Sequence, residues 1–75
     1  MKRNPVESSN LATVGYEAVI LEVEFHGGSV YRYYNVPVET YVGLMSADSP
    51  GGYLHAHVKT KGYRYEKIET VPAHK

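Results

Sequence analysis

The 75-residue chain contains no cysteine and no tryptophan, and it has a single phenylalanine. The lack of cysteine excludes disulfide bonds, thiolate metal sites and a cysteine nucleophile. A chain this short forms one domain and buries only about 60 to 65% of its unfolded surface, so its stability margin is small. Stability must therefore come from packing, in which the eight tyrosines are the only large aromatic side chains available in number.

The chain has no excess of charge, since eight basic side chains balance eight acidic ones. A net charge of zero argues against strong nonspecific binding to nucleic-acid phosphates. The charges are nevertheless uneven along the chain. The second quarter has acidic residues without a basic partner: Glu17, Glu22 and Glu24. The end of the chain predicts a basic patch: Lys59, Lys61, Arg64 and Lys67.

Long apolar runs are absent as well. No apolar stretch follows the basic first residues, which argues against a signal peptide. No window approaches the roughly 20 apolar residues of a membrane span. We therefore expect a soluble cytoplasmic protein that does not associate with membranes.

Residues 10–26 alternate between apolar and polar side chains with a period near two, which is typical of β-strands. In the second half of this segment Val19, Leu21, Val23 and Phe25 share one face, which we expect to face the core. Two glycines and a serine follow at 27–29, and a new apolar alternation begins at residue 30. Residues 18–35 are therefore predicted to form a β-hairpin.

The length of the hairpin loop decides where the tyrosines point. A three-residue loop at 27–29 pairs Phe25 with Tyr31 and Val23 with Tyr33, so both tyrosines face the core and Arg32 lies outside, opposite Glu24. A two- or four-residue loop would instead bury Arg32. Burying an unpaired arginine costs several kcal/mol, whereas a cross-strand pair contributes roughly 0.2 to 1 kcal/mol. We therefore predict the three-residue loop.

Two helices and a last strand are expected after the hairpin. Pro37 marks a helix start, and Val38, Tyr41, Val42 and Met45 have the spacing of one amphipathic helix. Ser49 and Pro50 predict a second, short helix over 50–58, with an apolar stripe that includes Leu54 and Val58. The alternation over 63–71 predicts a closing strand.

Together these elements predict an α+β domain: a small antiparallel β-meander of three strands plus a closing strand, packed by one amphipathic helix and a short second helix. We expect an unstructured head at 1–5, a single domain at 6–70 and an unstructured tail at 71–75. The expected core comprises Val19, Leu21, Val23, Phe25, Tyr31, Tyr33, Tyr41, Val42, Met45, Leu54 and Val58.

Candidate sites are few. The aromatic and basic residues near the end could bind nucleic acid by stacking and phosphate contacts, and for Tyr63 and Tyr65 stacking and core packing both stay open. This candidate set is Lys59, Lys61, Tyr63, Arg64, Tyr65 and Lys67. His55 and His57 would point about 200° apart on a helix, so no metal site is expected. Without a nucleophile motif or a phosphate loop, we expect no enzyme and no cofactor.

The order of these segments resembles the KTSC domain, a small bacterial and phage module named for its occurrence at the C-terminus of some lysyl-tRNA synthetases. The resemblance covers residues 6–68 and rests on Tyr31-x-Tyr33, on the following Val36-Pro37, and on "SPGGYLH" at 49–55. In the last stretch Leu54 and His55 stand where the family has Phe and Asn, so a role of that asparagine is not transferred to His55. The resemblance implies RNA binding, through the synthetase context, and brings no catalytic residues.

We therefore expect a noncatalytic binding module for RNA or another single-stranded nucleic acid. The alternative is a protein-protein interaction module that uses an exposed strand edge or a tyrosine patch.

Overall fold

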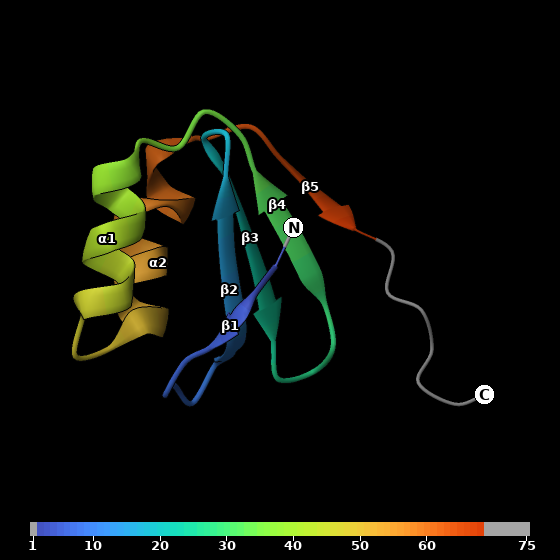
Figure 1. The fold of residues 1–75 in the computed structure, drawn as a ribbon, viewed down its shortest axis with the longest axis vertical. Coiled ribbons are helices and arrows are strands. Elements are labelled where there is room, and N and C mark those ends of the chain that lie inside the picture. The colour runs from blue at the N-terminus through green and yellow to red at the C-terminus, as the bar shows by residue number, and fades with distance from the viewer. Residues whose placement is uncertain (1, 69–75) are drawn as a thin grey trace.

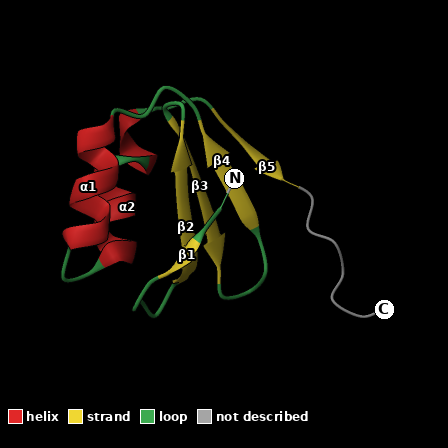
Figure 2. Cartoon of the chain, viewed as in Figure 1, coloured by secondary structure: helices red, strands yellow, loops and turns green. Residues whose placement is uncertain are grey.

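The computed structural model describes residues 2–68, which form an antiparallel sheet with two helices on one of its faces (Figure 1). The strands follow one another in the order β1-β2-β3-β4-β5, and Figure 2 shows β5 at the edge farthest from the helices. The elements are β1 (Asn4–Pro5), β2 (Leu11–Glu17), β3 (Ile20–Phe25), β4 (Val30–Tyr33), α1 (Val38–Ser46), α2 (Pro50–His57), the 3-10 turn η1 (Lys59–Lys61) and β5 (Tyr65–Ile68). The predicted α+β class with antiparallel strands and two helices is confirmed.

The N-terminal segment differs from the prediction of an unstructured head at 1–5. Asn4 and Pro5 form a short edge strand that pairs with Val14 and Thr13 of β2. An edge strand accommodates proline because its missing N–H need not serve the ladder. The meander thus gains a fifth strand. The predicted residues 69–71 of the closing strand, and the predicted tail at 71–75, lie outside the described residues.

The β3–β4 hairpin has its side chains on the predicted faces of the sheet, but its strands pair in a different register. Tyr33 pairs with Leu21 and Tyr31 with Val23, so the pairing is shifted by two residues. The Phe25 N–H donates to the Ser29 carbonyl at 2.9 Å, so the three connecting residues are 26–28 and not 27–29 as predicted. A shift of two residues leaves every side chain on the same face, since side chains alternate with a period of two. Both tyrosines therefore still point to the helix side.

The turn between β2 and β3 explains why Val19 is not in the core. Glu17 pairs with Ile20, so Ala18 and Val19 are the two connecting residues, and both have positive φ, 52° and 58°. This is the backbone that two-residue hairpins require and that β-branched residues disfavour. Val19 is 48% exposed, and its predicted place in the core is wrong.

Helix α1 is rotated relative to the predicted stripe. Leu44 is its buried residue, and Tyr41 stacks on Tyr16 of β2 with ring centroids 4.9 Å apart. Val42 is 55% exposed and Met45 is exposed as well, so their predicted core positions are wrong. A helix of nine residues that packs against a sheet and a second helix has its orientation set by these contacts, which the spacing of its apolar residues does not specify.

The contact between α1 and α2 depends on Gly43. A Cβ atom at this position would lie 2.0 Å from Oη of Tyr53 on α2, so only glycine fits without a shift of the tyrosine. The core itself lies between the sheet and the two helices. Its buried residues are Leu11, Val14, Leu21, Val23, Tyr33, Val36, Leu44, Leu54 and Val58, and Phe25, Tyr31 and Tyr41 pack at its margin.

Candidate functional site

The helix-side face of β4 and β5 holds a cavity of about 300 Å³, which we call the tyrosine pocket. Tyr31 and Tyr33 of β4 and Tyr65 of β5 reach it because cross-strand partners share a face, and Tyr33 pairs directly with Tyr65. The turn after α2 closes the other side. The lining residues are Tyr31, Tyr33, Lys59, Gly62, Tyr63 and Tyr65.

The aromatic rings of the tyrosine pocket differ sharply in exposure. Tyr33 is buried, with 3% of its surface exposed, whereas Tyr65 is 61% exposed. The ring of Tyr65 lies nearly parallel to that of Tyr31, with centroids 6.1 Å apart, and tilted against that of Tyr33 at 5.7 Å. Tyr65 is thus positioned by its neighbours and still offers aromatic surface to solvent, which is the requirement for a stacking platform.

The hydroxyl of Tyr33 remains protonated in this setting. Burial, aided by the neighbouring Tyr31 and Tyr65, raises the pKa of Tyr33 to about 12. Desolvation disfavours the phenolate because its charge loses hydration. At neutral pH this hydroxyl is therefore a neutral group and not a base.

Lys59 is the cationic residue of the tyrosine pocket. It is the first residue of η1, separated from the end of α2 by Val58, and its Nζ lies 5.1 Å from the centroid of the Phe25 ring, in cation–π geometry. Phe25 in turn contacts Tyr31 edge-on, with centroids 5.7 Å apart. At the end of η1, Gly62 has φ of 80°, a left-handed conformation that redirects the chain towards Tyr63 and that glycine adopts without strain.

A second, more open cavity of about 700 Å³ adjoins the tyrosine pocket, and we call it the glycine cleft. It lies between the segment before β2, the β3–β4 loop and the first turns of α2. Gly51 permits the close approach of these segments, since a Cβ there would lie 2.8 Å from Nδ2 of Asn10. The lining residues are Ser9, Asn10, Phe25, His26, Gly27, Gly51, Gly52, Leu54, His55 and Lys59.

The predicted basic patch is divided by the fold. Lys67 pairs with Tyr31 and so belongs to the helix-side face. Arg64 lies over the ring of Tyr34, 5.8 Å from its centroid, and the Tyr34 hydroxyl donates to Glu66 at 2.9 Å. Strand alternation assigns Tyr34 and Glu66 to the opposite face of the sheet. Arg64 therefore lies away from the tyrosine pocket.

Of the six predicted nucleic-acid-binding residues, Lys59, Tyr63 and Tyr65 come together in the tyrosine pocket, whereas Lys61, Arg64 and Lys67 do not line it. The sequence interpretation missed Tyr31 and Tyr33 as pocket-lining residues because it assigned both to the core. Strand alternation alone could not give the face of Tyr65, because two helices separate β5 from β4 and the face depends on the register in which the two strands pair.

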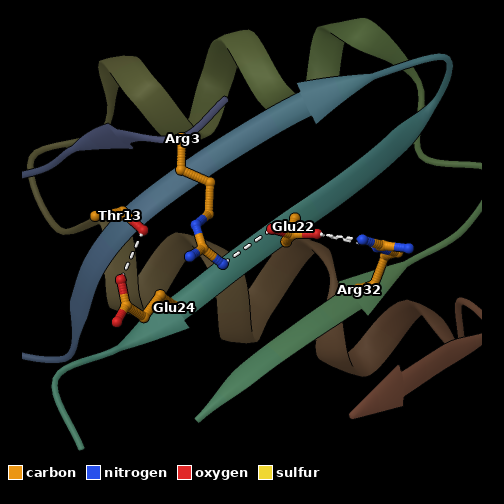
Figure 3. Close-up of polar contacts among 5 residues, drawn as sticks. All are labelled: Arg3, Thr13, Glu22, Glu24 and Arg32. Atoms are coloured by element: carbon orange, nitrogen blue, oxygen red, sulfur yellow. Dashed lines mark hydrogen bonds and ion pairs between the residues drawn. The ribbon is translucent and has the colours of Figure 1, made fainter. Parts of the chain in front are cut away.

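The face of the sheet without helices carries an ion-pair network (Figure 3). Glu22 is only 7% exposed, and its carboxylate accepts hydrogen bonds from Arg3 Nη1 at 2.9 Å and Arg32 Nη2 at 2.7 Å. The bond to Glu22 raises the pKa of Arg32 above its ordinary value. Arg3 reaches Glu22 across β2. Its path is open because the β2 residue paired with Glu22 is Gly15, which has no side chain.

This network corrects two sequence interpretations. Glu22 was expected to lack a basic partner, yet it is buried between two arginines. The predicted cross-strand pair of Arg32 with Glu24 is also wrong, because the register shift places Glu22 opposite Arg32. Glu24 instead accepts a hydrogen bond from the Thr13 hydroxyl at 3.0 Å.

The predicted second helix is confirmed as α2, with Ser49 at its N-cap accepting from the Gly52 N–H at 3.3 Å. His57 stacks on Tyr53, with ring centroids 4.2 Å apart, while His55 lines the glycine cleft. Within residues 2–68, no three histidine, aspartate or glutamate side chains lie close enough together to hold a metal ion. In the same part of the chain, no helix has the length and apolar character needed to cross a membrane.

Comparison with known proteins gives consistent matches. The KTSC domain model matches residues 7–67. A protein of Stutzerimonas stutzeri is 45% identical over 71 residues, covering 92% of this chain and 100% of its own. A lysine–tRNA ligase of Trichormus variabilis is 38% identical over 64 residues, which are 83% of this chain but 11% of the ligase. Among solved structures, a KTSC domain protein of Yersinia pestis is 32% identical with a TM-score of 0.81, over 91% of this chain and 97% of that one.

Proposed function

The chain belongs to the KTSC domain family, and we propose that it is a noncatalytic module that binds single-stranded RNA through the tyrosine pocket. The observation that carries this proposal is Tyr65, which is 61% exposed while its ring is held against Tyr31 and Tyr33. Stacking of a base on an exposed aromatic ring contributes about 1 to 3 kcal/mol and tolerates any base.

The charges around the tyrosine pocket support an anionic ligand. Lys59 lines the pocket and Lys67 belongs to the same face of the sheet. No carboxylate is among its lining residues in the described part of the chain. The formal net charge of zero provides no long-range attraction, so we expect affinity in the micromolar range or weaker near physiological salt.

Two further observations bear on the ligand and on catalysis. One relative is a lysine–tRNA ligase that contains a matching segment, which favours RNA over DNA. The Tyr33 hydroxyl, whose pKa lies above the ordinary tyrosine value of 10, is protonated at neutral pH as other tyrosines are, so it is no candidate for a general base. The tyrosine pocket offers rings, hydroxyls and one ammonium group, which suit binding rather than bond cleavage.

The test is a fluorescence anisotropy titration of a labelled single-stranded RNA against the wild type, Tyr65→Ala and Tyr65→Phe. We expect Tyr65→Ala to weaken binding by about 5- to 150-fold, the equivalent of one stacked base, and Tyr65→Phe to retain it because the ring is kept. Absence of binding by the wild type at low salt, or equal affinity of wild type and Tyr65→Ala, would overturn the proposal.

Salt dependence provides a second readout with a matched control. Lys59→Gln is expected to lower the magnitude of the slope of log affinity against log salt by about 0.7, as for one lost single-strand phosphate contact. Lys61→Gln removes an equal charge from the same short turn, but Lys61 does not line the tyrosine pocket. We expect the Lys61 variant to have the smaller effect.

A protein-protein interaction module is the second candidate, and one observation favours it. The outer side of α1 exposes an apolar stripe of Val38, Val42 and Met45, which is the type of helix face that docks into a partner. Binding through this stripe would respond little to salt and would be lost in Val42→Glu, whereas RNA binding through the tyrosine pocket would survive that substitution.

A further inference from the structure

The glycine cleft and the tyrosine pocket adjoin at Lys59, which lines both. We propose that the glycine cleft binds the phosphate attached to the nucleotide whose base stacks on Tyr65, so that the recognised unit is a phosphorylated nucleotide rather than a base alone. This inference rests on the proposed function and deepens it, because it assigns a phosphate subsite next to the stacking platform.

The two cavities share one lining side chain. Lys59 lines both of them. Its Nζ lies above the ring of Phe25, which lines the glycine cleft and also contacts Tyr31 of the tyrosine pocket. Among the described lining residues, Lys59 is the one lysine or arginine, and it lies at the boundary of the two cavities, where a phosphate joined to a stacked nucleoside would lie.

The polar groups of the glycine cleft suit a phosphate. Asn10 and Ser9 supply an amide and a hydroxyl, and His55 supplies an imidazole, all of which can donate hydrogen bonds to phosphate oxygens. The chain has eight acidic residues, yet none of the described ones lines either cavity. In a protein of zero net charge, this distribution leaves a region without carboxylates around Lys59.

One glycine at the rim of the cleft leaves room for a ligand group. Gly27 at its rim has open space around it, since a Cβ there would meet no atom within 4 Å. Gly51 and Gly52 lie in the first turn of α2, where a Cβ atom would approach Asn10 or Ser49, so they allow close packing at the wall of the cleft. The resulting cavity of about 700 Å³ falls in the range typical of small-ligand sites, which is roughly 300 to 1,000 Å³.

The open space at Gly27 allows a charge to be introduced without disturbing the fold. Gly27→Asp places a carboxylate at the rim of the glycine cleft, and Gly27→Asn places a neutral side chain of nearly the same shape there. Gly27 does not line the tyrosine pocket, so stacking on Tyr65 should be unaffected. We expect Gly27→Asp to bind RNA about threefold to tenfold more weakly than Gly27→Asn at low salt, because the two side chains have nearly the same shape and only the carboxylate repels a phosphate.

The decisive experiment is a titration of ¹⁵N-labelled wild-type protein, followed by NMR, with adenosine, adenosine 3′-monophosphate and adenosine 5′-monophosphate. The amides of Gly62 and Tyr65 report on the tyrosine pocket, and those of Gly27, Gly51 and Gly52 report on the glycine cleft. We expect adenosine to shift the first group only. At least one monophosphate should shift both groups and bind several-fold more tightly than adenosine, and which one does so indicates the direction of the strand.

The outcomes separate this inference from the proposed function. If both monophosphates shift only the amides of the tyrosine pocket and bind no better than adenosine, the phosphate subsite is wrong and base stacking stands. If neither adenosine, its monophosphates nor single-stranded RNA shifts the amides of the tyrosine pocket, the proposed function fails and the subsite with it. Equal RNA affinity of Gly27→Asp and Gly27→Asn would also overturn the subsite.

Discussion

Tyr33 and Tyr65 face each other across β4 and β5, with ring centroids 5.7 Å apart, yet one is buried and the other is mostly exposed. The difference arises because Tyr33 lies on a strand flanked by β3 and β5, whereas β5 is the last strand of the described sheet. One pair of cross-strand residues thus joins the core to the surface proposed to bind RNA.

The first prediction separates the roles of this pair. Tyr33→Ala should lower the free energy of unfolding by about 3 kcal/mol or more, because it removes a buried aromatic ring from the core. Tyr65→Ala should change it by less than about 1 kcal/mol, since the lost ring is largely exposed. Urea unfolding of the two variants measures both values. An unchanged unfolding midpoint for Tyr33→Ala would contradict the assignment of Tyr33 to the core.

A second prediction concerns alkaline pH. The folded-state pKa of Tyr33 is raised to about 12, whereas an unfolded tyrosine titrates near 10. Its contribution to stability is therefore fully present below pH 10, and it is lost as the pH rises towards 12 because only the unfolded chain ionises there. The loss should be on the order of 2 kcal/mol. Thermal unfolding between pH 9 and 11.5 measures it, and Tyr33→Phe, which cannot ionise, should show a shallower decline than the wild type.

The turn between β2 and β3 offers a stabilising change. Ala18 and Val19 both have positive φ, which costs a non-glycine residue roughly 1 kcal/mol or more. Replacing the pair by Asn-Gly, the sequence that two-residue hairpin turns prefer, should raise the free energy of unfolding by about 1 to 2 kcal/mol. The melting temperature provides the measurement, with Ala18→Asn alone as the intermediate control. A lower melting temperature for the double variant would show that Val19 makes a contribution beyond the turn.

Glu22 is expected to be important for stability although it lies on the face without helices. Glu22→Ala leaves Arg3 and Arg32 without their shared carboxylate and should lower the free energy of unfolding by about 1 to 3 kcal/mol. Glu24→Ala removes only the hydrogen bond from Thr13 and should cost about 1 kcal/mol or less. Chemical denaturation of both variants tests the ranking, and equal losses would argue against a special role of the arginine pairs.

Much of the fold follows from local patterns in the sequence. Alternation over 19–26 and 30–34 predicts the β3–β4 hairpin and the faces of Tyr31 and Tyr33, because strand side chains repeat every two residues. Ser49 and Pro50 predict the start of α2, because a capping hydroxyl and a fixed φ act within one turn. The resemblance carried by Tyr31-x-Tyr33 and Val36-Pro37 leads to the family that the comparisons show.

The sequence by itself determined the α+β class, the two helices and the side of the sheet that the central tyrosines occupy, since these depend on periodicities and caps that act over a few residues. Only the tertiary structure decided that Glu22 rather than Glu24 binds Arg32, that α1 exposes Val42, and that Tyr65 and Lys59 meet Tyr31 in one pocket. The reason is physical: strand register and helix rotation can change without altering the local pattern, so contacts between distant segments select them.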